Sequence, residues 1–82
     1  MNEKIMVVDD DKDIREVIQV LLSSEGYEVI EASNGKEALE LVDDDTDFII
    51  LDVMMPEMNG YQACVLLREK TKAPILFLTA KG

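Results

Sequence analysis

FIILD, residues 48–52, is an unbroken apolar run that ends in an aspartate. A short run without polar alternation is typical of a strand that is buried on both faces of a sheet. This is the strongest strand pattern in the chain, and it places the carboxylate of Asp52 at the carboxyl end of a buried strand. A strand of this kind needs helices on both sides of its sheet, which favours an α/β fold.

Three further segments fit strands, at residues 4–8, 27–32 and 75–78. The first is the apolar run KIMVV, which is followed by Asp9 and Asp10. The last is ILFL, which follows a proline and is itself followed by Thr79. Three of the four predicted strands therefore end on side chains that carry oxygen.

Helical patterns fill the intervals between these strands. After the first strand, apolar residues recur at the spacing i, i+3, i+4, i+7, i+8, which predicts an amphipathic helix carrying Ile14, Val17, Ile18, Leu21 and Leu22. Asp11 is its expected N-cap, and Gly26 is expected to end it.

Two shorter helices are predicted later in the chain. Asn34 with Glu37 resembles a capping box, and the helix after it presents Ala38, Leu39, Leu41 and Val42. The next helix covers residues 61–70 and presents Ala63, Cys64 and Leu67 on one face. The acidic run 43–47 between them is interpreted as solvated. The alternation of strand and helix predicts a doubly wound parallel sheet in the order β-α-β-α-β-α-β.

The carboxyl ends of parallel strands meet at one edge of the sheet, where ligands of such folds bind. We therefore expect Asp9, Asp10, Asp52 and Thr79 to share one crevice. Several carboxylates close together repel one another, so the site favours protons or a cation. Mg²⁺ fits because it takes oxygen ligands and usually keeps several waters. For any single strand-end Asp, a helix cap or a turn is the more common role. For Thr79 alone, a hydroxyl bonded to the backbone is as common as a functional one.

The composition narrows the possible functions. The net charge is −10 with no histidine, which argues against binding of nucleic acid or an anionic membrane by this segment. No apolar run approaches the ~20 residues of a membrane span. Cys64 is the single cysteine, so an internal disulfide is excluded and a cytoplasmic location is expected.

Two sharper alternatives fail on spacing. Asp9, Asp11 and Asp13 imitate the start of an EF-hand loop, but Ile14 stands where that loop needs glycine, and Val20 stands where it needs glutamate. A phosphatase with an aspartyl nucleophile would resemble the strand that ends at Asp52. Such enzymes typically carry a second aspartate two residues later, where this chain has Met54.

Four segments together resemble the response-regulator receiver family of two-component signalling: VVDDD at residues 7–11, NGKEAL at 34–39, ILDVMMP at 50–56 with Asn59-Gly60, and LTA at 78–80. The resemblance covers residues 5–81 and implies a flavodoxin-like fold with strand order 2-1-3-4-5. This is one of the common strand orders of doubly wound parallel sheets. It implies that Asp52 accepts a phosphoryl group from a sensor histidine kinase. It further implies that Asp9, Asp10, Asp52 and the Met54 carbonyl hold Mg²⁺, and that the Thr79 hydroxyl turns toward the phosphoryl group.

The resemblance also implies that residues 1–82 are the N-terminal part of a receiver domain, without its last helix, strand and helix. In the family that last strand carries a lysine that pairs with the phosphoryl group, and Lys81 follows Thr79 too closely to match it. We therefore expect a signalling module rather than a turnover enzyme, with impaired activity in this form. Two alternatives remain: an interaction module that folds by self-association into a dimer, and, with less support, a Mg²⁺-dependent phosphatase.

Overall fold

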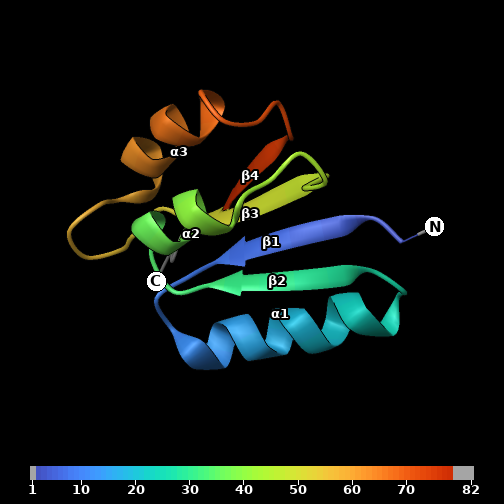
Figure 1. Ribbon diagram of the computed structural model, residues 1–82. Helices are drawn as coiled ribbons and strands as arrows, with labels where there is room; N and C mark the ends of the chain where they lie inside the picture. Colours follow the sequence, from blue (N-terminus) through green and yellow to red (C-terminus); the bar gives the residue numbers. More distant parts are fainter. Residues whose placement is uncertain (1, 79–82) are drawn as a thin grey trace.

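Four parallel strands form a single sheet in the computed structural model, which describes residues 2–78 (Figure 1). They are β1 (Lys4–Val8), β2 (Glu28–Ala32), β3 (Phe48–Asp52) and β4 (Ile75–Leu78), in the spatial order β2-β1-β3-β4. Every pairing between them is parallel. The predicted fold class is confirmed, and the order of these four strands agrees with the order that the resemblance implies.

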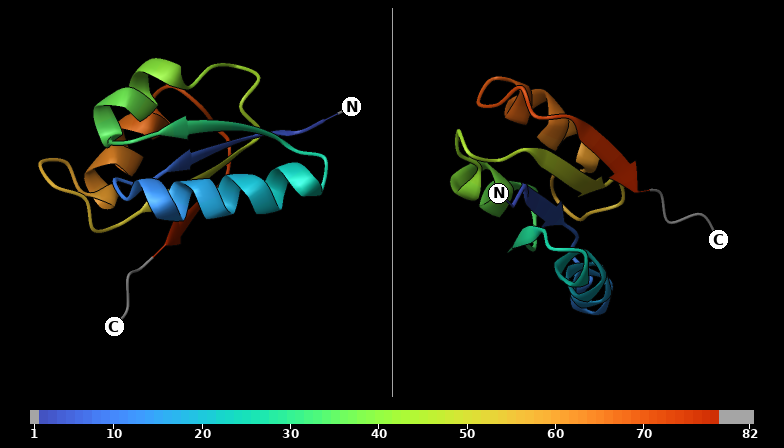
Figure 2. Two further views of the ribbon diagram at one scale, coloured as in Figure 1. Left: turned by 90° about the horizontal axis from the view of Figure 1, so that it is seen from below. Right: turned by 90° about the vertical axis from the view of Figure 1, so that its right-hand side faces the viewer.

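The helices lie on both faces of the sheet, as the end-on view in Figure 2 shows. They are α1 (Lys12–Ser24), α2 (Gly35–Leu41) and α3 (Gly60–Arg68). Helix α1 lies along one face next to β1 and β2, while α2 and α3 lie on the other face (Figures 1 and 2). Within residues 2–78, no helix is long and apolar enough to cross a membrane.

The main core lies between the sheet and the layer of α2 and α3. Its fully buried side chains come from the middle of the strands and from one face of each of these helices: Met6, Val8, Ile49, Leu51, Ala38, Ala63 and Leu67. Small residues on the helices let them approach the sheet closely. Cys64 packs half-buried against this core, as expected for a small apolar residue.

The face that carries α1 is much less covered. Ile18 and Leu22 are half-buried, but no residue of α1 is buried, and Ile14, Val17 and Leu21 are exposed. The amphipathic pattern therefore predicted the helix correctly but not the burial of its whole apolar stripe. A similar correction applies to α2, where Leu41 is 41% exposed rather than part of the packed face.

The helix ends follow local hydrogen-bonding rules. Asp11 caps α1, and Gly26, with φ of +93°, follows the C-cap residue Glu25 and ends the helix, as predicted. Asn34 caps α2, but Glu37 accepts hydrogen bonds from Ser33 instead of closing a capping box with Asn34. A complete capping box occurs at α3 between Asn59 and Gln62, where none was predicted.

Strand order changes direction between β1 and β3. From β1 the chain passes through α1 to β2 on one side, and from β2 it crosses through α2 to β3 on the other side of β1. The carboxyl ends of β1 and β3 therefore open into the crevice between the two crossovers, which is where ligands bind in folds of this type.

Candidate functional site

Three carboxylates meet at this crevice. Asp9 directly follows β1, Asp10 comes next, and Asp52 is the last residue of β3. One oxygen atom from each lies within 4.8 Å of the others. Asp9 and Asp52 are buried, at 3% and 6% exposure, whereas Asp10 is exposed. The cluster therefore has two fixed acids at its base and one acid at its rim.

The cluster lines an open cavity of about 350 Å³. The rest of the lining comes from Asp11, Ile14, Met54 and Leu78. Leu78 pairs with Asp52 in the register of β3 and β4, so the end of β4 borders the same cavity. The structure thus brings together the three predicted acids and places Met54 beside them. Thr79, together with Ala80 and Lys81, lies outside the described residues.

Backbone N–H groups hold the two buried carboxylates in place. The N–H of Asp11 donates to Oδ1 of Asp9 at 2.9 Å, and the N–H of Met54 donates to Oδ1 of Asp52 at 3.1 Å. Asp11 is engaged elsewhere, because its carboxylate accepts from the N–H groups of Asp13 and Ile14. Asp11 is therefore the helix cap, as predicted, and is not a fourth acid of the site.

Burial raises the pKa of both Asp9 and Asp52 above the ordinary aspartate value. The charge of Asp10 raises both pKa values further, while the backbone N–H donors partly oppose the shift. Within residues 2–78, no lysine or arginine forms an ion pair with any of the three acids. The site is therefore a negatively charged hollow in which a proton or a metal cation would relieve the repulsion.

The loop after β3 folds back tightly on the end of that strand. The N–H of Gly60 donates to the carbonyl of Val53 at 2.9 Å. A Cβ atom at Gly60 would collide with the carbonyl oxygen of Asp52 and lie 2.8 Å from the Cα atom of Val53. Glycine is therefore required at the start of α3, and this close approach supports the backbone of Asp52.

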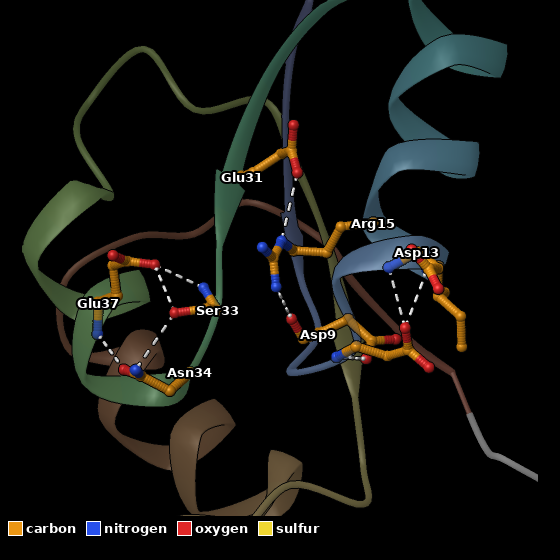
Figure 3. Close-up of polar contacts among 9 residues, drawn as sticks. Asp9, Asp13, Arg15, Glu31, Ser33, Asn34 and Glu37 are labelled. Carbon is orange, nitrogen blue, oxygen red and sulfur yellow. Dashed lines mark hydrogen bonds and ion pairs between the residues drawn. The ribbon is translucent and has the colours of Figure 1, made fainter.

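One charged pair beside the acids escaped the sequence analysis. Arg15 of α1 donates to the carbonyl oxygen of Asp9 and forms an ion pair with Glu31 of β2 (Figure 3). Its spacing six residues after Asp9 fits the first turn of a helix that folds back on the strand end. A cation close to the start of a helix that follows an acidic strand end is the sequence pattern that could have indicated this contact.

The comparisons with known proteins agree on one family. A sequence model for the response regulator receiver domain matches residues 5–82. The transcriptional regulatory protein YrkP of Bacillus subtilis (strain 168), described as uncharacterized, is 47% identical over 82 residues, a match that covers 100% of this chain and 36% of that protein. The transcriptional regulatory protein CpxR of Escherichia coli (strain K12) is 44% identical over 79 residues, covering 96% of this chain and 34% of that protein. The chain thus spans about a third of the length of these relatives.

Solved structures give the same result. The response regulator TrrA of Thermotoga maritima, determined in complex with Mg²⁺-BeF, superposes with a TM-score of 0.88 at 42% identity. The chemotaxis protein CheY4 of Vibrio cholerae superposes with a TM-score of 0.85 at 36% identity. Each match covers 100% of this chain and 72% of the solved chain.

Proposed function

The chain belongs to the response regulator receiver domain family, and from this we propose that it is a phosphoryl-accepting module in which Asp52 takes a phosphoryl group from a sensor histidine kinase. Receiver domains of two-component response regulators are generally signalling modules rather than turnover enzymes. We extend that role to this chain, with a cytoplasmic location and no contact with nucleic acid through this segment. The observation that carries the proposal is the meeting of Asp9, Asp10 and Asp52 at the carboxyl ends of β1 and β3.

Asp52 is the acceptor in this proposal because of its place in the fold. It ends β3, which lies between β1 and β4, so its carboxylate faces the cavity with a strand on either side. The Met54 N–H engages Oδ1. An oxygen of Asp52 would attack the phosphorus, an O–P bond would form, and the P–N bond to the kinase histidine would break. The electron pair of that bond stays on the imidazole, which then takes a proton from water.

The residues of the site fit a Mg²⁺ ion. Three carboxylates with oxygens within 4.8 Å of one another form a hard donor set, and burial disfavours the charge of two of them unless a cation is present. Asp9, Asp10 and Asp52 would hold the ion, with the Met54 carbonyl as a further ligand. A bound ion supplies positive charge that offsets the carboxylates and the phosphoryl oxygens. Thr79 would donate its hydroxyl to the transferred group.

Intact-mass measurement after incubation with a small acyl phosphate donor and Mg²⁺ tests the proposal. The wild-type protein should gain one phosphoryl group, and Asp52→Ala should not. Asp44→Ala is the matched control, because Asp44 is an exposed aspartate of the loop before β3 and lies outside the cavity. Uptake by Asp52→Ala at the wild-type rate would exclude Asp52 as the acceptor.

A further inference from the structure

Arg15 occupies an unusual position for a cation. It lies at the start of α1, where the helix dipole disfavours positive charge. Its side chain is nevertheless only 14% exposed. Neither the helix dipole nor solvation favours a guanidinium in this place, so its contacts must compensate.

Those contacts join three elements beside the acidic site. Nη1 of Arg15 donates to the carbonyl oxygen of Asp9 at 2.7 Å, and Nε lies 3.2 Å from Oε1 of Glu31. Figure 3 shows Arg15 between Glu31 on β2 and Asp9 at the end of β1, with a contact to each. The guanidinium therefore ties the turn between β1 and α1 to the neighbouring strand.

The contact completes the hydrogen bonding of Asp9. The N–H of Asp9 donates to the carbonyl of Ala32 at 3.1 Å, its carboxylate accepts from the N–H of Asp11, and its carbonyl accepts from Arg15. That carbonyl belongs to the peptide unit that links Asp9 to Asp10. Its orientation sets the direction in which Asp10, the exposed acid of the cluster, leaves the strand.

We propose that Arg15 is a positioning residue of the acidic site, which orients the Asp9–Asp10 peptide so that both carboxylates face one cation. The inference rests on the proposed function, which supplies the cation. Glu31 holds the other edge of the guanidinium and balances its charge. Arg15 thus acts on the site through the Asp9 carbonyl and does not form an ion pair with the acids.

Arg15→Lys is the informative variant, because lysine keeps the charge but lacks the planar fork that reaches a carbonyl and a carboxylate together. Arg68→Lys is the matched control. Arg68 also donates from its guanidinium to a backbone carbonyl, that of Ala73, which precedes β4 at the end of the sheet away from the acids. Two quantities are measured for each protein: the Mg²⁺ dissociation constant by calorimetry, and the Asp9 carbonyl-carbon chemical shift without metal.

We expect Arg15→Lys to weaken Mg²⁺ binding about tenfold or more, as loss of groups that orient metal ligands does, and to move the Asp9 carbonyl shift. Arg68→Lys should change neither quantity. If Arg15→Lys binds Mg²⁺ within about twofold of wild type, or if Arg68→Lys loses as much, the inference is wrong and the proposed function stands. If the wild type fails to bind Mg²⁺, the proposed metal-assisted function fails instead. The Asp9 carbonyl-carbon chemical shift, measured without metal, then decides separately whether Arg15 orients this peptide. An unchanged shift in Arg15→Lys overturns the inference.

Discussion

At the scale of single residues, the acidic site is a compromise between burial and charge. Asp9 and Asp52 lie almost out of contact with water, yet the charged side chains that act on their pKa values are other carboxylates. Each retains one backbone N–H donor that favours its ionised form. Holding negative charge in the crevice therefore lowers the free energy of unfolding. Removal of one of these charges should raise it again.

Asp52→Asn should stabilise the metal-free protein at neutral pH. A folded-state pKa above the unfolded value of 3.8 means that the group favours folding only while it is protonated, and this contribution is lost as pH rises through the raised pKa. The asparagine removes that loss and keeps an oxygen for the Met54 N–H. We expect the melting temperature at pH 7 to rise by a few degrees, since about 1 kcal/mol corresponds to roughly 4–8 °C in a domain of this size.

Melting curves of both proteins from neutral to acidic pH check the sign. The gain should shrink as pH falls toward 3.8, where the wild-type carboxyl group also becomes neutral. Asp44→Asn, at an exposed position, should show no comparable gain. A variant that is less stable than wild type at pH 7 would contradict the account of the site as a strained cluster of like charges.

At the scale of elements, the sequence predicts most of what builds the site. Apolar runs that end on carboxylates are strong signals for β1 and β3, and parallel topology brings their ends together without further information. Contacts between segments distant in the chain leave no such pattern. Arg15 with Glu31 is one example, and Lys4 with Asp43 is another, since Asp43 lies in a run that was interpreted as solvated. The exposure of Val17 and Leu21 could not be predicted either, because periodicity reports an apolar stripe and not what covers it.

The turn from β3 into α3 gives a prediction at this scale. Gly60→Ala should cost about 3 kcal/mol of unfolding free energy, because its Cβ meets the backbone of Asp52 and Val53, which cannot move without disturbing β3. Gly35→Ala is the control, since Gly35 also opens a helix. Its added Cβ would lie 2.6 Å from Sδ of Met58, the end of a flexible side chain, so the cost should be much smaller.

Urea unfolding of the two variants measures the difference. Equal costs at the two glycines would mean that the loop after β3 is free to shift and does not support Asp52 rigidly. A larger cost at Gly35 would reverse the assignment of which contact is the rigid one.

At the scale of the whole molecule, the two faces of the sheet are unequal. One is covered by α2 and α3, while on the other α1 leaves much apolar surface exposed. Val17, Leu21 and Leu76 are 59%, 61% and 51% exposed. A second cavity of about 360 Å³, lined mainly by apolar side chains such as Ile5, Leu22, Phe48 and Ile50, lies on this face at the opposite end of the strands from the acids. Among the described strands, β4 forms one edge of the sheet.

Exposed apolar surface next to an open strand edge favours pairing with another chain. We predict that the 82-residue chain pairs with a second copy of itself through β4 and this face. The net charge of −10 on each copy opposes the contact. That repulsion is screened over roughly 10 Å at about 0.1 M salt, whereas burial of apolar surface gains about 25 cal/mol per Å² and is not screened by salt.

Sedimentation at several protein concentrations tests this balance. The dimer fraction should grow with concentration, and it should also grow between about 0.1 M and about 1 M salt, because screening removes repulsion without weakening an apolar contact.

Leu76→Lys should abolish the dimer, since it places a charge on the exposed edge strand. Val65→Lys, at a position of α3 that is 65% exposed on the other face, should leave it intact. A monomer at every concentration and salt level would show that the charge prevails. Equal loss in both variants would show that the contact does not lie along β4.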